Sequence, residues 1–471
     1  MVKYSKRRGF VGGTYLYPTE LSRPLSTLPE IHVRTRVRHP RLKYVLRIVG
    51  EDLGYRFRFY NESRLTAGTE PRFLISYGGP ARDHRLPAHP LLAGKPYAAA
   101  AEDLRHDAEG MPTLCQTADG PDLLAAIFFC LARYEEYQSV EPDTHGRFPA
   151  SASHAFRHGY LDRPIVREWT AVLGRRLRSW FPDLPPVRHR LLDFQPTYDI
   201  DILYAYRFRG WRGHASAVRD LLTGHPGRAM ARYSPRPDPY DTLADLEALH
   251  RQFKLRPTYY WLLSDRTHRH DPNPYPIPAE QRTWMHRLAE TADLGIHPSY
   301  RSSEELSLIV AEKERLEAIV GRTVTRSRQH YLRFRLPDTY RALLDAGLRS
   351  DATMGYGDVV GWRAGTNLPF AWYDLERERE TRLMIHPFAA MDVTLRNYLG
   401  LSAEASAGKV LALAGATVPY GGPFQLLWHN SSFAVDYGWG GWWAMYRQLV
   451  ADLMGLGTNP PAGDRVPRVP G

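Results

Sequence analysis

The stretch Phe194-Gln-Pro-Thr-Tyr-Asp-Ile-Asp201 decides the fold of this chain. It reads as a β-strand, whose alternating side chains place Asp199 and Asp201 on the same side. Two carboxylates that converge at a strand end can bind a divalent metal through one and deprotonate a bound water with the other. A solvated or helix-capping acidic pair is an equally good interpretation of this motif alone. The motif therefore needs partners elsewhere in the chain.

From about Leu191 onward, short apolar runs alternate with helical runs, which predicts about seven β/α units around a mostly parallel sheet. The candidate strands end at Asp199, Leu263, His297, Arg328, Thr353, Ile385 and His429. The candidate helices between them span residues 242–252, 279–291, 303–320, 337–346 and 403–413. In β/α barrels the reactive residues lie at the C-terminal ends of the strands. Polar residues at these ends are therefore the candidates for function.

Partners for the two aspartates follow several of these strands. His297 stands in Gly295-Ile-His-Pro-Ser-Tyr-Arg301, directly after an apolar run, and Arg328 and His330 follow the next one. His429, in Leu427-Trp-His429, is framed by apolar residues that can desolvate it. A single histidine at a strand end is more often structural than catalytic. Four such strand ends in order favour a functional site.

The first 190 or so residues read as a separate α/β region. Its expected strands are residues 44–48, 55–60 and 73–77, and its expected helices are residues 122–137 and 165–180. The proline-containing stretch 181–187 predicts a domain boundary. The expected organisation is an N-terminal α/β domain over 1–188, a β/α barrel over 189–454 and a mobile tail rich in Pro, Gly and Arg over 455–471.

Composition excludes several classes of protein. Of 471 residues, 43% are hydrophobic and 24% charged, which is typical of a packed globular protein. The only cysteines, Cys115 and Cys130, form no CxxC pair, so a disulfide framework and a cysteine-based zinc ribbon are excluded. We interpret the metal-like residues of Thr267-His-Arg-His-Asp271 as solvated surface, because they lie in a loop rich in Pro and Asn.

The net charge of +11 comes from 62 basic and 51 acidic residues, and lysine occupies only seven positions. The arginines spread over the whole chain without a basic helix or an aromatic RNA-binding motif, so we expect no nucleic-acid partner. An anionic glycan remains compatible with this charge. No apolar run approaches the roughly 20 residues of a membrane span, and none resembles a secretory signal. We therefore expect a cytoplasmic protein without a membrane span.

The ordered set of strand ends resembles the polysaccharide deacetylase family, also known as the NodB-homology or carbohydrate esterase family 4 enzymes. The resemblance runs from about Leu191 to about Trp443 and implies a distorted (β/α)7 barrel. It implies that Asp199 is the general base, that Asp201 and His297 are metal ligands, that Arg328 pairs with the base, and that His429 is the general acid.

One position departs from the family pattern. A second metal-binding histidine commonly stands four residues after the first, and here that position is Arg301, which has no lone pair to offer a metal. Three alternatives follow: His330 completes an Asp201/His297/His330 site, two protein ligands and waters hold the metal, or the site is degenerate. We favour the first, because histidine is the commonest metal ligand and His330 falls at a barrel mouth.

The whole chain also resembles a bacterial subgroup in which such a barrel follows an N-terminal domain of unknown function. The supporting segments are Arg41-Leu-Lys-Tyr-Val-Leu46, 122–137, His145-Gly-Arg-Phe-Pro-Ala-Ser151, Asp238-Pro-Tyr240, 295–300, 327–332, 351–356, Arg363-Ala-Gly-Thr366 and 427–432. In that subgroup the His-Pro-Ser-Tyr form of the second motif, as at residues 297–300, is usual. The departure at Arg301 therefore belongs to the subgroup rather than to this chain alone.

These resemblances imply a hydrolase that uses a divalent metal, with zinc expected before cobalt or another ion, to remove acetyl groups from N-acetylated sugar units of a glycan or glycan precursor. We expect Tyr198, Tyr300, Arg333 and Trp428 to contact that substrate. Two alternatives stay open. One is a degenerate barrel that binds glycan or assembles with glycan-synthesis enzymes without catalysis, and the other is a hydrolase of a small amide. The N-terminal domain is expected to supply substrate binding or the surface of a homo-oligomer.

Overall fold

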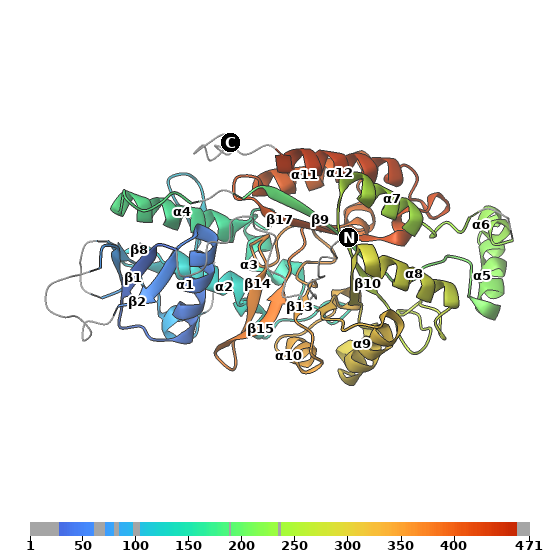
Figure 1. The fold of residues 1–471 in the computed structure, drawn as a ribbon, viewed down its shortest axis with the longest axis horizontal. Helices are drawn as coiled ribbons and strands as arrows, with labels where there is room; N and C mark the ends of the chain where they lie inside the picture. Colours follow the sequence, from blue (N-terminus) through green and yellow to red (C-terminus); the bar gives the residue numbers. More distant parts are fainter. Residues whose placement is uncertain are drawn as a thin grey trace, which may run out of the picture.

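The computed structural model describes residues 28–60, 71–79, 84–97, 104–187, 190–233 and 237–458. Figure 1 shows an elongated molecule with the N-terminal elements, in blue to teal, at one end. The helical hairpin of α5 (Gly210–Leu222) and α6 (Pro226–Ala231) projects at the opposite end. The expected boundary at 188 and 189 lies outside the described residues.

The N-terminal region contains a four-stranded parallel sheet in the order β2-β1-β3-β4. Its strands are β1 (Glu30–Arg34), β2 (Arg56–Phe59), β3 (Leu74–Tyr77) and β4 (Arg85–Leu86). Its helices are α1 (Pro40–Leu53), α2 (Leu123–Leu131), α3 (His154–Arg157) and α4 (Ile165–Trp180). Four two-residue strands, β5 (Arg105–His106), β6 (Pro112–Thr113), β7 (Gln116–Thr117) and β8 (Gly120–Pro121), form two small antiparallel pairs. The expected strands at 55–60 and 73–77 and the helix at 165–180 are confirmed.

Two expectations in this region are wrong. Residues 44–48 form the middle of α1 and not a strand. Pro40 at the first turn, the His39 cap and the left-handed Gly54 delimit a helix, and the buried side chains recur at helical spacing. The helix expected over 122–137 ends at Leu131, because Arg133 adopts a left-handed conformation with φ 50° before a short 3-10 turn over Tyr134–Tyr137.

The remaining chain forms a curled nine-stranded sheet in the order β14-β15-β13-β12-β11-β10-β9-β17-β16. Its strands are β9 (Leu192–Ile200), β10 (Thr258–Trp261), β11 (Asp293–Ile296), β12 (Arg326–Ser327), β13 (Ser350–Asp351), β14 (Phe370–Asp374), β15 (Arg379–Ile385), β16 (Ala390–Met391) and β17 (Gly422–His429). All neighbours are parallel except β14 and β15, which are antiparallel. Each strand expected from the sequence has a counterpart, and β14 and β16 are additional.

Helices follow the strands along the outside of this sheet (Figure 1). They are α7 (Leu243–Phe253), α8 (Ala279–Thr291), α9 (Ser307–Val320), α10 (Asp338–Asp345), α11 (Ala403–Thr417) and α12 (Trp442–Thr458). The sequence predicted that the tail begins at residue 455, but helix α12 continues to Thr458. Residues 459–471 lie outside the described residues. Among the described helices, none combines the length and the apolarity that crossing a membrane requires.

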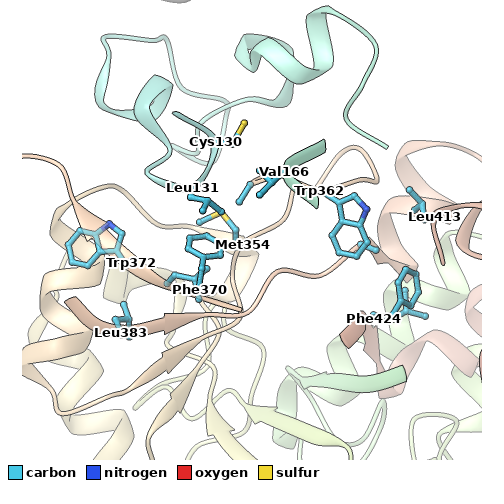
Figure 2. Close-up of a cluster of buried hydrophobic side chains, with 14 of the residues drawn as sticks. Cys130, Leu131, Val166, Met354, Trp362, Phe370, Trp372, Leu383, Leu413 and Phe424 are labelled. Carbon is cyan, nitrogen blue, oxygen red and sulfur yellow. The ribbon is translucent and has the colours of Figure 1, made fainter. Parts of the chain in front are cut away.

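The two regions share one hydrophobic core. Figure 2 shows Cys130, Leu131 and Val166 of the N-terminal region above Met354 and Trp362 of the second region. All five side chains are buried. Both cysteines are buried, and the two form no disulfide with each other. Because apolar surface from both regions is removed from water together, each region stabilises the other.

Polar contacts reinforce this junction. Arg41 on α1 forms an ion pair with Glu378 at 2.5 Å, and Arg363 pairs with Glu136 at 2.7 Å. Arg167 on α4 also donates to the side chain of Asn367, at 2.9 Å. Arg363 and Glu136 are almost fully buried, so removing one partner would leave an uncompensated charge. The N-terminal region is therefore held in one orientation against the large sheet.

Candidate functional site

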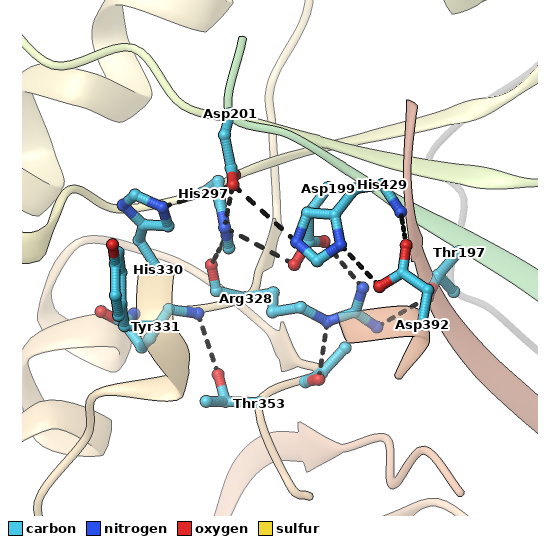
Figure 3. Close-up of polar contacts among 12 residues, drawn as sticks. Thr197, Asp199, Asp201, His297, Arg328, His330, Tyr331, Thr353, Asp392 and His429 are labelled. Atoms are coloured by element: carbon cyan, nitrogen blue, oxygen red, sulfur yellow. Dashed lines mark hydrogen bonds and ion pairs between the residues drawn. The ribbon is translucent and has the colours of Figure 1, made fainter. Parts of the chain in front are cut away.

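The acidic pair of the opening motif lies at the C-terminal end of β9. Asp199 and Asp201 point to the same side, as the strand alternation predicts (Figure 3). The parallel register places His429 of β17 beside Asp199, and Tyr260 of β10 on its other side. The centre of the sheet therefore brings together residues that are far apart in the sequence.

Asp199 is held by a buried arginine. Nη1 of Arg328 donates to Oδ1 of Asp199 at 2.8 Å, and Nη2 donates to Oγ1 of Thr197 at the same distance. The third contact runs from Nε of Arg328 to the carbonyl oxygen of Ala352, at 2.9 Å. Arg328 is fully buried and Asp199 is 1% exposed. One carboxylate oxygen of Asp199 is thus engaged, while Oδ2 faces His297 at 3.5 Å.

The second aspartate faces two histidines. Nε2 of His297 lies 3.3 Å from Oδ1 of Asp201, and Nε2 of His330 lies 3.5 Å from Oδ2. Potential ligand atoms of these three residues all lie within 4.8 Å of one another. The structure thus brings together the three residues expected to bind metal.

The other ring nitrogens of both histidines are already engaged. Nδ1 of His297 donates to the carbonyl oxygen of Arg328 at 2.5 Å, and Nδ1 of His330 contacts Oδ1 of Asp271 at 3.0 Å. In the neutral rings, each Nε2 therefore directs a lone pair towards Asp201, and Oδ1 of Asp201 has no hydrogen-bond partner among the described residues. Lone pairs that face one another need a cation between them, and such outer hydrogen bonds typically orient metal-binding histidines.

The spacing of these atoms also fits a metal. Two tetrahedral ligands at about 2.0 to 2.1 Å from one zinc lie about 3.3 Å apart, and each histidine Nε2 lies at about that distance from one Asp201 oxygen, 3.3 Å for His297 to Oδ1 and 3.5 Å for His330 to Oδ2. Burial lowers the pKa of His330, but the carboxylates of Asp201 and Asp271 outweigh burial and raise it to about 9, so without a metal this ring carries a positive charge that a metal would replace. Burial raises the pKa of Asp201, but His330 and His297 outweigh burial and hold this pKa well below its ordinary value. The residues present therefore fit a divalent cation.

Asp271 corrects one interpretation of the sequence. The loop that contains it was expected to be solvated surface, yet Asp271 is fully buried. Its Oδ1 accepts from Nδ1 of His330 and also from the backbone N–H of Tyr300, at 2.7 Å. His268 is exposed, as expected of a surface residue, whereas Arg269 is exposed but also lines the pocket described below. The sequence alone does not show that one member of a polar loop turns inward.

His429 is oriented by an aspartate that the sequence analysis missed. Oδ1 of Asp392 contacts Nδ1 of His429 at 2.8 Å, and Oδ2 accepts from the backbone N–H of His429 at 2.6 Å. Burial lowers the pKa of His429, but Asp392 and Asp201 outweigh it and raise the pKa to about 10. Its Nε2 faces the site, 3.8 Å from Oδ2 of Asp201. Asp392 directly follows Met391, the last residue of β16, a strand that the sequence did not predict.

A pocket with a cavity volume of about 250 Å³ opens onto these groups. It is lined by Arg147, Asp199, Asp201, Arg269, His270, Pro272, His297, Gln329, His330, Tyr331, Leu332, Met391, Val393, Tyr398, Leu427 and His429. The walls combine apolar side chains with polar groups that converge on one point. Such a lining is typical of a site for a small molecule or for one unit of a polymer.

The four residues expected to contact substrate fall outside this lining. Tyr198 and Trp428 are fully buried on the opposite faces of their strands, where both pack against Tyr446, so their expected role is corrected. Tyr300 and Arg333 lie behind the wall, with the guanidinium of Arg333 3.8 Å from the centre of the Tyr300 ring. They support the pocket and do not line it.

Arg301, which stands where the family has its second histidine, also lies away from the pocket. It pairs with Asp265 at 3.3 Å and with Glu305 at 3.0 Å. His330 instead occupies the place beside Asp201. Arg301 is therefore not one of the ligand candidates among the described residues, which are Asp201, His297 and His330.

One family model matches part of the chain. Residues 31–182 match the model of a family of unknown function, DUF7033. A comparison with curated proteins gives no match.

Solved structures similar to this chain include polysaccharide deacetylases. A putative polysaccharide deacetylase from Mycobacterium smegmatis is 14% identical with a TM-score of 0.38, and the alignment covers 59% of this chain and 86% of that one. A polysaccharide deacetylase from Bacillus cereus is 8% identical with a TM-score of 0.28, and the alignment covers 56% of this chain and 88% of that one. A family 4 carbohydrate esterase from Streptomyces lividans, in complex with acetate, is 10% identical with a TM-score of 0.28, and the alignment covers 57% of this chain and 91% of that one.

Proposed function

We propose that this chain is a metal-dependent hydrolase that removes the acetyl group from an N-acetylated sugar unit. One observation carries the proposal. A candidate metal site, a carboxylate held by a buried arginine, and a histidine held by an aspartate all face the same pocket. Hydrolysis of an amide needs these three functions: activation of water and carbonyl, a base, and an acid for the leaving amine.

Asp201, His297 and His330 would hold the metal, and a bound zinc would polarise the carbonyl and lower the pKa of a water. Three protein ligands leave a position open for water or substrate, which is the usual composition of a catalytic zinc site. Asp271 and the carbonyl of Arg328 keep the two imidazole rings in the orientation that this role needs.

Asp199 is the base in this proposal. Arg328 neutralises Oδ1 and fixes the carboxylate, so that Oδ2, next to His297, is the oxygen that takes the proton from the attacking water. His429 is the acid. Asp392 holds its ring by Nδ1 and supports the positive charge, and the proton on Nε2 passes to the nitrogen of the departing amine.

The test is the metal content of the purified full-length protein, wild type beside His297→Ala and His330→Ala. We expect about one metal per chain in the wild type and a loss in both variants, with His286→Ala on the exposed face of α8 as the matched control. Acetate release from N-acetylglucosamine oligomers is measured on the same samples and is expected to follow the metal. Wild-type protein that holds no metal and releases no acetate, even after zinc or cobalt is added, contradicts the proposal.

A further inference from the structure

One wall of the pocket comes from the N-terminal region, within the part that matches the family of unknown function. Arg147 lines the same pocket as Asp199 and Asp201, although it precedes them by about 50 residues and belongs to the other region of the chain. It is 9% exposed. The large sheet alone therefore does not complete the pocket.

The Arg147 side chain is fixed by specific contacts. Its Nε pairs with Oδ2 of Asp143 at 2.7 Å, and its Nη1 donates to the carbonyl oxygen of Tyr331 at 3.0 Å. Tyr331 directly follows His330, so the guanidinium contacts the segment that carries one candidate metal ligand, and both residues line the same pocket. A side chain at Gly357 would overlap Nη1, so glycine at this position makes the space that the guanidinium occupies. These contacts hold a charged group in a defined place.

Arg333 and Tyr300 hold the loop that carries Arg147. Nε of Arg333 donates to the carbonyl oxygen of His145 at 2.6 Å, while the same guanidinium stacks on Tyr300. The ring of His145 completes the contact, with Nδ1 3.2 Å from the hydroxyl of Tyr300. Tyr300 and Arg333 thus act on the pocket through this loop.

The charges of the pocket wall are unequal. Asp199 and Asp201 are its only acidic residues among those described, and both are engaged by Arg328 and by the histidines. Arg147 and Arg269 are its two arginines, and Arg147 is paired with Asp143, which does not line the pocket. The described residues form hydrogen bonds with Nε and Nη1 of Arg147 but none with its Nη2, and the side chain lines the pocket. An arginine fixed beside a substrate site typically recognises a carboxylate or a phosphate.

We propose that Arg147 is a specificity residue that selects an N-acetylated amino sugar carrying an anionic group, a carboxylate or a phosphate. This inference rests on the proposed function, because it assumes that the acetylated unit occupies the same pocket. The N-terminal region then contributes directly to substrate recognition. Asp143 and Tyr331 set the direction of the guanidinium, and Arg269 adds to the positive potential around it.

The experiment measures binding without turnover, by calorimetry on the full chain. The probes are N-acetylglucosamine, N-acetylmuramic acid, which adds a carboxylate, and N-acetylglucosamine 6-phosphate. We expect the wild type to bind at least one charged sugar about tenfold more tightly than the neutral one, since a hydrogen bond to a charged group contributes about that much. Comparison of the two charged sugars shows whether carboxylate or phosphate is preferred.

Arg147→Gln is expected to bind the charged and the neutral sugar equally, while Arg147→Lys keeps part of the preference. Arg251→Gln, which removes the same charge from the exposed last turn of α7, outside the pocket lining, is the control and is expected to behave as wild type. A wild type that does not discriminate the sugars, or an Arg147→Gln variant that weakens both equally, overturns the inference. Discrimination without acetate release would overturn the proposed function and leave the anion subsite standing.

Discussion

Replacement of Arg328 by methionine tests the central ion pair of the site. Methionine is also an unbranched side chain, but it cannot form the hydrogen bonds to Asp199, Thr197 and the carbonyl of Ala352. Asp199 then stays buried, 1% exposed, without its cation. Removing one partner of a buried ion pair typically costs about 3 to 5 kcal/mol, because an uncompensated charge remains in a medium of low polarity. We expect Arg328→Met to lose that much free energy of unfolding.

The assay is equilibrium unfolding in urea, followed by tryptophan fluorescence on protein treated with a chelator so that bound metal does not add to stability. The double variant Asp199→Leu with Arg328→Met removes both charges and fills both places with apolar groups. We expect it to recover at least about 2 kcal/mol relative to Arg328→Met, because replacing a whole buried pair is often close to neutral. The reasoning is refuted if Arg328→Met costs less than about 1 kcal/mol, or if the double variant is no more stable than the single one.

Three further predictions concern Asp271, Asp392 and His250. Asp271→Asn weakens the support of His330, so zinc affinity in a competition titration should fall about 10- to 100-fold; an unchanged affinity would contradict the proposed ligand set. Asp392→Asn should lower the rate of acetate release while metal content stays at the wild-type level, because Asp392 touches His429 and none of the candidate ligands. Burial lowers the pKa of His250 to about 3, so its contribution to stability is present above pH 6.5 and is lost as pH falls towards 3. Between pH 7 and 5 this loss is about 2 kcal/mol, and His250→Phe should show a correspondingly flatter dependence in urea unfolding; equal slopes would argue against a neutral buried ring.

Much of the large sheet could be predicted because its strands and helices alternate with clear periodicity. The helix α8 coincides with its expected span, and the strand ends at Ile385 and His429 are the observed ones. In the N-terminal region the apolar run from Tyr44 to Ile48 carried no such signal. A short buried run fits a strand or a helix equally well, and the caps around α1 decided between them.

The site residues also divide into those that a local sequence pattern predicts and those that no local pattern reveals. Period-two alternation put Asp199 and Asp201 on one side of β9, and applied consistently it would have excluded Tyr198 and Trp428, which point to the opposite faces of their strands. The buried positions of Asp271 and Asp392 had no comparable local pattern. Each is a single polar residue whose neighbours in sequence do not reveal its partner in space.

The sequence by itself determined which residue types end the parallel strands, and therefore that carboxylates, histidines and an arginine meet at one edge of the sheet. That follows because strand direction and side-chain alternation are local properties of the chain. Only the tertiary structure decided that His330 takes the place beside Asp201, that Arg301 turns to Asp265 and Glu305, and that Arg147 closes the pocket from the other region. These outcomes depend on how loops distant in sequence pack and pair their charges, and no local pattern encodes that packing.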